Sequence, residues 1–175
     1  MGERGRDCAL ASQARRSYGR STSIVRHRSL RLVNVNGGAM PLIGGCFCGR
    51  VRYHISAPLG PGRSCHCSRC RKAFSGAGSA YAEVLPGSFA WLSGEEHLTH
   101  YESSPGWGLT FCAVCGTTMC GTHGGEVHGV TLGSLDGDPG VKIEMHIFID
   151  SRAPWDTIGG NAPRYPEFPP RTATD

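Results

Sequence analysis

The sequence predicts an all-β domain stabilised by metal ions, and three observations support this prediction. Apolar and polar residues alternate with a period of two over several short stretches, which is typical of strands with one buried face. The 175 residues include 26 Gly and 11 Pro, enough for many tight turns. Seven of the nine cysteines have the spacing of metal ligands. We therefore expect a single domain of short strands with bound zinc.

Residues 1–39 form an Arg-rich extension that we expect to be disordered. They contain eight arginines against Glu3 and Asp7, a net charge of +6, and few hydrophobic residues that could offset the entropy of ordering the chain. The composition changes abruptly at Met40, and translation could begin there. An organelle-targeting peptide is the other interpretation, because the segment is rich in Arg and Ser and poor in acids. Residues 40–170 are then the folded zinc domain.

The charge of the folded part argues against binding to nucleic acid or to a membrane surface. Residues 40–175 carry ten basic and twelve acidic side chains, so the excess positive charge belongs to the extension. No stretch approaches the roughly 18 apolar residues of a membrane span, and no apolar run suits a signal peptide. The odd number of cysteines favours reduced thiols, and we expect a soluble cytoplasmic protein.

Strand candidates occupy most of the chain from Gly44 onward. Val51, Tyr53 and Ile55 alternate with polar residues, and every second residue from 143 to 149 is apolar. Turn signals bound the other expected strands, which are 79–85, 89–92, 97–102, 117–123 and 127–132. A short helical turn is expected at 71–74. The five prolines after Ala153 indicate irregular chain on the domain surface.

Two pairs of cysteines predict a closed metal site. Residues two apart in a strand point to the same face, so Cys46 and Cys48 can reach one ion. The C-x-x-C turn of Cys112 and Cys115 brings both sulfurs to one point, and Gly116 permits the positive φ that such a turn often needs. Four thiolates form a tetrahedral structural zinc site, whose binding energy stabilises the fold.

The remaining three cysteines predict an open metal site. Cys65, Cys67 and Cys70 lie within six residues, so one short loop can present three thiolates to one ion. The fourth coordination position is left for water or substrate, which is typical of catalytic zinc. We therefore predict two Zn²⁺ per chain and assign these three cysteines to a catalytic site.

A single zinc ribbon is the alternative arrangement. The two C-x-x-C pairs, Cys67 with Cys70 and Cys112 with Cys115, would then bind one ion. This alternative accounts for four cysteines and leaves three of the seven unexplained.

Two further cysteines and two histidines also carry specific expectations. Cys120 is expected to be a buried, inert thiol, and Cys8 an exposed thiol in the extension. His66 could be a fourth zinc ligand, but its place between two chelating cysteines favours a side chain that points away. His66 and His146 are the candidate proton carriers, although position 146 also suits a solvent-facing strand residue.

The motif order Gly-Cys-x-Cys-Gly, Cys-His-Cys-x-x-Cys-Arg, Phe-Cys-x-x-Cys-Gly resembles the glutathione-dependent formaldehyde-activating (GFA) family, which also contains centromere protein V. The resemblance covers residues 42–168 and includes the stretches 51–53, 91–94, 101–106, 146–148 and 153–155. It implies a β-tent of packed antiparallel sheets in a CENP-V/GFA zinc domain. The implied structural zinc ligands are Cys46, Cys48, Cys112 and Cys115, and the implied catalytic zinc ligands are Cys65, Cys67 and Cys70.

The resemblance also implies a function. Family members are described as carbon–sulfur lyases of the S-(hydroxymethyl)glutathione synthase type, which make or break the adduct of formaldehyde with the glutathione thiol. The partners would be a small thiol, glutathione or similar, and an aldehyde. One rival hypothesis is a non-catalytic zinc-binding interaction module, as centromere protein V suggests. Another is a reductase of related β-tent shape with Cys120 as its nucleophile.

Overall fold

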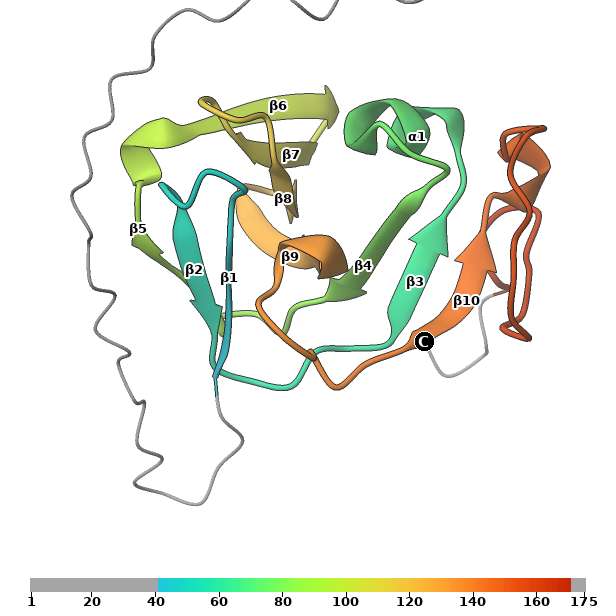
Figure 1. Ribbon diagram of the computed structural model, residues 1–175, viewed down its shortest axis with the longest axis horizontal. Helices are drawn as coiled ribbons and strands as arrows, with labels where there is room; N and C mark the ends of the chain where they lie inside the picture. The colour runs from blue at the N-terminus through green and yellow to red at the C-terminus, as the bar shows by residue number, and fades with distance from the viewer. Residues whose placement is uncertain (1–40, 171–175) are drawn as a thin grey trace, which may run out of the picture. The chain divides into compact units, whose positions relative to one another are not determined.

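The computed structural model describes residues 41–170, so the expectations for residues 1–40, including Cys8 and a start at Met40, lie outside the described residues. Within this range the prediction of an all-β fold is confirmed, with ten strands in two sheets and one α-helix (Figure 1). Three short 3₁₀ helices complete the regular structure: η1 (Glu95–His97), η2 (Leu132–Ser134) and η3 (Ile149–Ser151).

The smaller sheet is antiparallel and contains three strands. Their order is β1 (Leu42–Gly45), β2 (Arg52–Ile55) and β5 (Phe89–Ser93). The predicted apolar face is confirmed, because Val51, Tyr53 and Ile55 are at most 1% exposed. Gly44 makes room for the Tyr53 ring, since a Cβ at Gly44 would lie 2.4 Å from the ring's Cζ atom. The small sheet therefore packs through the face that the alternation indicates.

The larger sheet has seven strands and is mixed rather than wholly antiparallel. Its order is β10 (Ile143–Ile147), β3 (Gly62–Cys65), β4 (Ser79–Glu83), β9 (Glu126–Thr131), β8 (Thr118–His123), β7 (Trp107–Cys112) and β6 (Leu98–Ser104). The expected antiparallel pairing holds for every other neighbouring pair of strands, and β10 alone pairs in parallel, with β3. Chain segments far apart in sequence meet there, and the register places His146 beside Ser64 and Ile147 beside Cys65.

Three strands, β1, β3 and β7, were not among those expected from the sequence. β3 reads Gly-Arg-Ser-Cys, and its strand conformation depends on hydrogen bonds to β10 and β4 on its two sides. β1 is hydrogen-bonded to one neighbouring strand, β2, and β7 is hydrogen-bonded to two, β6 and β8. From residue 153 to residue 170 the chain is irregular, as expected, with one isolated bridge between His146 and Arg164.

The helix α1 (Ser68–Phe74) is longer than the predicted turn at 71–74. It begins earlier because Cys67 is its N-cap, with a sulfur that accepts a hydrogen bond from the Cys70 backbone N–H at 3.3 Å. Ser75 ends the helix in the left-handed conformation, with φ of 50°. The open cysteine motif thus lies at the junction of a strand and a helix.

The hydrophobic core is built from residues of both sheets. Its buried members come from β2, β7, β8, β9 and the adjoining turns, and they are Cys46, Val51, Tyr53, Ile55, Val84, Cys112, Met119, Cys120 and Val130. Two of the predicted structural zinc ligands are thus part of the core.

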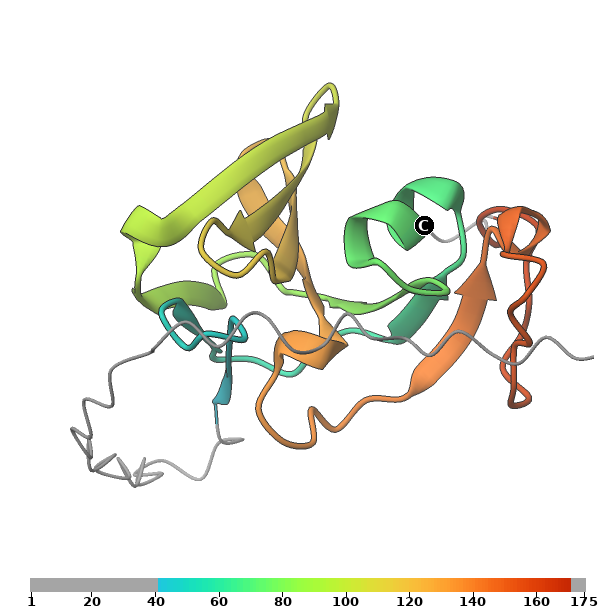
Figure 2. The same cartoon turned by 45° about the horizontal axis from the view of Figure 1, so that its top comes forward.

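The seven-stranded sheet is strongly curved. Its β6 and β7 end lies on one side of the concave face, and α1 lies on the other side (Figures 1 and 2). Two hydrogen bonds join α1 to the far strands: the Arg69 guanidinium donates to the Ser103 carbonyl in β6, and the Thr118 hydroxyl donates to the Ala73 carbonyl from β8. The helix therefore bridges the two sides of the curled sheet. The one α-helix of residues 41–170 is too short to cross a membrane.

Candidate functional site

The first cysteine group consists of Cys46, Cys48, Cys112 and Cys115. Their four sulfur atoms all lie within 4.8 Å of one another. The Cys46 and Cys48 sulfurs are 3.5 Å apart, and the Cys48 and Cys112 sulfurs are 3.9 Å apart. Tetrahedral zinc with Zn–S bonds near 2.3 Å places its sulfur ligands roughly 3.8 Å apart. The group therefore has the donor set and the spacing to hold a metal ion.

Two tight turns present these sulfurs. The Gly49 N–H donates to the Cys46 carbonyl at 3.0 Å, and the Gly116 N–H donates to the Cys112 carbonyl at 2.8 Å. Both glycines have φ of 75°, a conformation that costs little for Gly and is strained for other residues. The glycine that follows each cysteine pair is therefore needed for the turn.

Thr117 connects the two turns. Its hydroxyl oxygen accepts a hydrogen bond from the Phe47 N–H at 3.0 Å and lies 3.2 Å from the Cys115 sulfur. Cys46 and Cys112 are 6% and 0% exposed within the core. The group thus joins the start of the domain to its middle, and none of its cysteines lines the cavity described below.

The second group consists of Cys65, Cys67 and Cys70, whose sulfurs also lie within 4.8 Å of one another. Cys65 ends β3, and the other two cysteines lie at the start of α1. A hydrogen bond from the Cys65 thiol lowers the pKa of Cys70 to about 6 and raises the pKa of Cys65. Among residues 41–170, no His, Asp or Glu joins either group. Three donors could hold a metal ion with one coordination position free.

The structure does not form the alternative zinc ribbon. Cys67 and Cys70 lie with Cys65, whereas Cys112 and Cys115 lie with the first cysteine pair. Two separate groups that could hold metal ions are therefore present in the described part of the chain.

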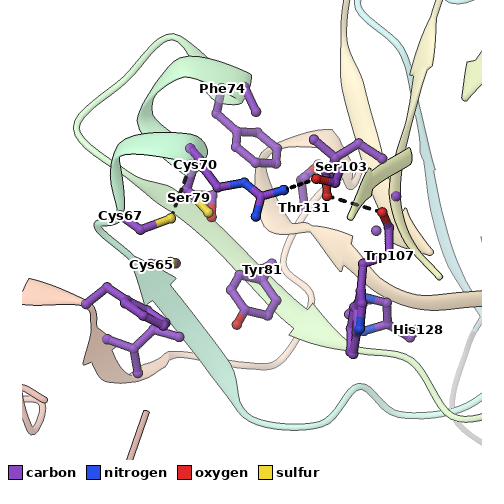
Figure 3. Close-up of a pocket in the computed structure, with 18 of the residues that line it drawn as sticks. Cys65, Cys67, Cys70, Phe74, Ser79, Tyr81, Ser103, Trp107, His128 and Thr131 are labelled. Atoms are coloured by element: carbon purple, nitrogen blue, oxygen red, sulfur yellow. Dashed lines mark hydrogen bonds between the residues drawn. The ribbon is translucent and has the colours of Figure 1, made fainter. Parts of the chain in front are cut away.

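A cavity of about 550 Å³ opens beside the second group (Figure 3). All three of its cysteines line the cavity, and none of the four cysteines of the first group does. The floor comes from the concave face of the large sheet and the side from α1. Figure 3 shows Tyr81 between the cysteines and a far wall formed by Trp107 and His128. Only the second group can therefore meet a small molecule in this cavity.

Two ionisable groups of the cavity wall are affected by burial. Burial raises the pKa of Tyr81, so its hydroxyl keeps its proton near neutral pH. Burial lowers the pKa of His128, and the neighbouring His123 lowers it further. The wall thus presents a neutral phenol and a neutral imidazole.

The two predicted proton carriers lie together outside this cavity. The His66 Nε2 atom is 3.0 Å from the His146 Nδ1 atom, and the His66 Nδ1 atom is 3.5 Å from a carboxylate oxygen of Asp156. Burial lowers the pKa of His146, with a further contribution from His66. His146 is half-buried rather than solvent-facing, and neither histidine lines the cavity.

Sequence reasoning missed the cavity wall, and the missed residues include Tyr81, Trp107 and His128. These side chains belong to three different strands and to no motif. The glycines of β7, β8 and β9 were an available signal, because Gly within a strand often marks a close approach.

Cys120 is fully buried in the core and does not line the cavity. Burial raises its pKa to about 12, which keeps the thiol protonated and unreactive. This environment is unsuited to the nucleophile of a reductase.

Comparisons with known proteins agree with the motif order. The family model described as "Glutathione-dependent formaldehyde-activating enzyme" matches residues 41–151. A protein of Halomonas elongata, provisionally named as a glutathione-dependent formaldehyde-activating enzyme, is 30% identical over 128 residues, covering 66% of this chain and 80% of the relative. A crystal structure of a Rhodobacter sphaeroides protein matches with a TM-score of 0.47 at 27% identity, covering 70% of this chain and 98% of that one. The family model and the Halomonas relative establish that this chain belongs to the GFA family.

Proposed function

We propose that Cys65, Cys67 and Cys70, with the cavity beside them, form the active site of a zinc-dependent carbon–sulfur lyase. The reaction would be of the S-(hydroxymethyl)glutathione synthase type, in which a thiol adds to an aldehyde or the adduct dissociates. One observation carries the proposal: four thiols lie in the core or packed against it, whereas three line a cavity of about 550 Å³. Membership of the GFA family and the name of the Halomonas relative support the same chemistry.

The donor sets of both groups suit zinc, which takes four thiolates in structural sites and three protein ligands in catalytic sites. When bound at the three-cysteine group, zinc would supply Lewis acidity and lower the pKa of an incoming thiol. At the four-cysteine group it would contribute folding free energy. The proposal therefore includes two Zn²⁺ per chain.

The chain's own residues would position the aldehyde and exclude water. Addition forms one C–S bond, breaks the π bond of the carbonyl group, and moves the thiol proton to the carbonyl oxygen. Tyr81 lines the same cavity as the three cysteines, and its hydroxyl, whose pKa is raised by burial, would be the hydrogen-bond donor to that oxygen. The apolar side chains of the wall limit the water that would compete for the aldehyde.

A rate measurement tests this proposal. The zinc-loaded full-length protein should accelerate the exchange between free and adduct forms of thiol–aldehyde mixtures, measured by exchange NMR. We expect an acceleration over buffer of at least about tenfold at catalytic protein concentrations, linear in protein. The set should include glutathione, cysteine and 2-phenylethanethiol, each with formaldehyde and with phenylacetaldehyde. No acceleration for any pair would contradict a lyase and favour the zinc-binding interaction module.

A further inference from the structure

The wall of the cavity is largely aromatic and aliphatic. Phe74 of α1, Trp107 and Leu109 of β7, and Ile147 of β10 line it, together with Phe148 and Phe168. Trp107 is 46% exposed, a large ring left accessible at the opposite end of the cavity from the cysteines (Figure 3). Pockets of this composition bind the apolar part of a ligand and use a few polar groups to orient it.

The charges of the wall do not match those of glutathione. Glutathione carries two carboxylates and one ammonium group near neutral pH. No Asp or Glu lines the cavity in the described part of the chain, so an ammonium group would lose hydration without an ionic partner. Arg69 is the one permanently charged residue of the lining, and its guanidinium already donates to the Ser103 carbonyl. A neutral ligand would avoid these desolvation costs.

The shape of the far wall suits a flat ring. The His128 imidazole lies against the backbone of Gly121. A Cβ at Gly121 would lie only 3.0 Å from the His128 Nε2 atom, so the absence of a side chain there makes room for the imidazole. The Trp107 ring stands edge-on to this imidazole, with centroids 5.0 Å apart and planes at 86°. Trp107 also packs at 4.1 Å on the ring of His123. Two imidazoles thus hold the indole in place, and a further ring can pack on its accessible surface.

We propose that the substrate of the three-cysteine site carries an uncharged aromatic or branched aliphatic group, which packs against Tyr81, Trp107 and Phe148. This inference rests on the proposed lyase function and identifies its substrate class. The group could belong to the thiol or to the aldehyde, because both become parts of one adduct. In either case the S–H bond adds across the C=O bond, with sulfur bonded to carbon, the proton on oxygen and no change in total oxidation state.

Equilibrium binding tests the proposal without relying on turnover. Calorimetric titration of the zinc-loaded protein should give a Kd for 2-phenylethanethiol at least about tenfold below those for glutathione and 2-mercaptoethanol. Trp107→Ala should weaken 2-phenylethanethiol binding about fivefold to tenfold and leave 2-mercaptoethanol unchanged. Trp155→Ala is the matched control, because Trp155 is 68% exposed and does not line the cavity. 2-Mercaptoethanol binding as tight as 2-phenylethanethiol binding, or equal effects of the two Trp variants, would overturn the proposal.

Exchange rates then show which partner carries the ring. A preference for 2-phenylethanethiol with formaldehyde places the ring on the thiol, and a preference for glutathione with phenylacetaldehyde places it on the aldehyde. Either preference supports the proposal if Trp107→Ala removes it. If glutathione with formaldehyde is the best pair and is insensitive to Trp107→Ala, the substrate class is wrong while the lyase function stands. Binding of 2-phenylethanethiol that depends on Trp107, without turnover of any pair, supports the cavity's ligand class and overturns the lyase function.

Discussion

Cys112→Ser should prevent the domain from folding cooperatively at room temperature. Zinc binding to structural sites is worth about 10–16 kcal/mol in zinc-finger peptides, whereas a whole domain is stable by only about 5–15 kcal/mol. Cys112 also lies fully buried in the core, so loss of the metal would leave polar groups there. Thermal melting followed by circular dichroism should show no cooperative transition, and bound zinc should fall below two per chain.

Cys120→Ser provides the matched control for this experiment. It makes the same chemical change at a cysteine that is equally buried but belongs to neither cysteine group. The cost should be that of burying a hydroxyl group, about 1–3 kcal/mol, with cooperative melting retained. If the two variants melt at the same temperature, the four-cysteine group contributes no more than its packing, and its assignment to structural zinc is wrong.

The double substitution Cys67→Ser, Cys70→Ser should abolish the exchange activity and preserve the fold. Two of the three proposed catalytic ligands are lost, which should raise the activation free energy by about 3 kcal/mol or more and so slow the exchange on the order of a hundredfold or more. The fold should persist because neither residue is in the core and the four-cysteine group is intact. Serine at position 67 can still cap α1 through its hydroxyl group.

Both properties are measured on the same preparation, by exchange NMR and by thermal melting. Lys72→Ser is the control, because Lys72 lies exposed on the same helix and outside the lining of the cavity. It should retain activity and melting temperature. Activity that survives in the double variant would place the chemistry elsewhere, and loss of cooperative melting would show that the three-cysteine group is structural.

The small sheet could be predicted from sequence where local alternation is strong. The alternation identifies the buried face directly in the case of Val51, Tyr53 and Ile55. Side chains two residues apart in a strand point to the same face, whichever strand lies beside it. By contrast, β3 contains one apolar residue in four, and its strand conformation depends on neighbours more than ten residues away. The parallel pairing of β3 with β10 likewise depends on tertiary packing that no local pattern specifies.

The grouping of the cysteines was predictable because each half of a group is local. A C-x-C or C-x-x-C pair fixes two sulfurs within one turn, so only the combination of the halves had to be inferred. The structure places Cys46 and Cys48 with the Cys112 turn, and Cys65 with the start of α1.

The cavity could not be predicted in the same way. Tyr81, Trp107 and His128 come from β4, β7 and β9, and the tertiary arrangement of the sheet brings them around one cavity. His66 and His146 show the converse case. They suit proton transfer by residue type, but the pairing of β10 with β3 places them together outside the cavity.

The most direct test of the central claim is a thiol titration of the cobalt-substituted protein, followed by thiolate-to-cobalt charge-transfer absorption. The claim is that the three-cysteine group accepts an external thiol and the four-cysteine group does not. Addition of 2-mercaptoethanol, glutathione or 2-phenylethanethiol should therefore change the absorption of one of two cobalt ions per chain. The Cys67→Ser, Cys70→Ser variant should show no change with any of them. The claim is contradicted if no thiol changes the spectrum of the unaltered protein, or if the same change persists in the double variant.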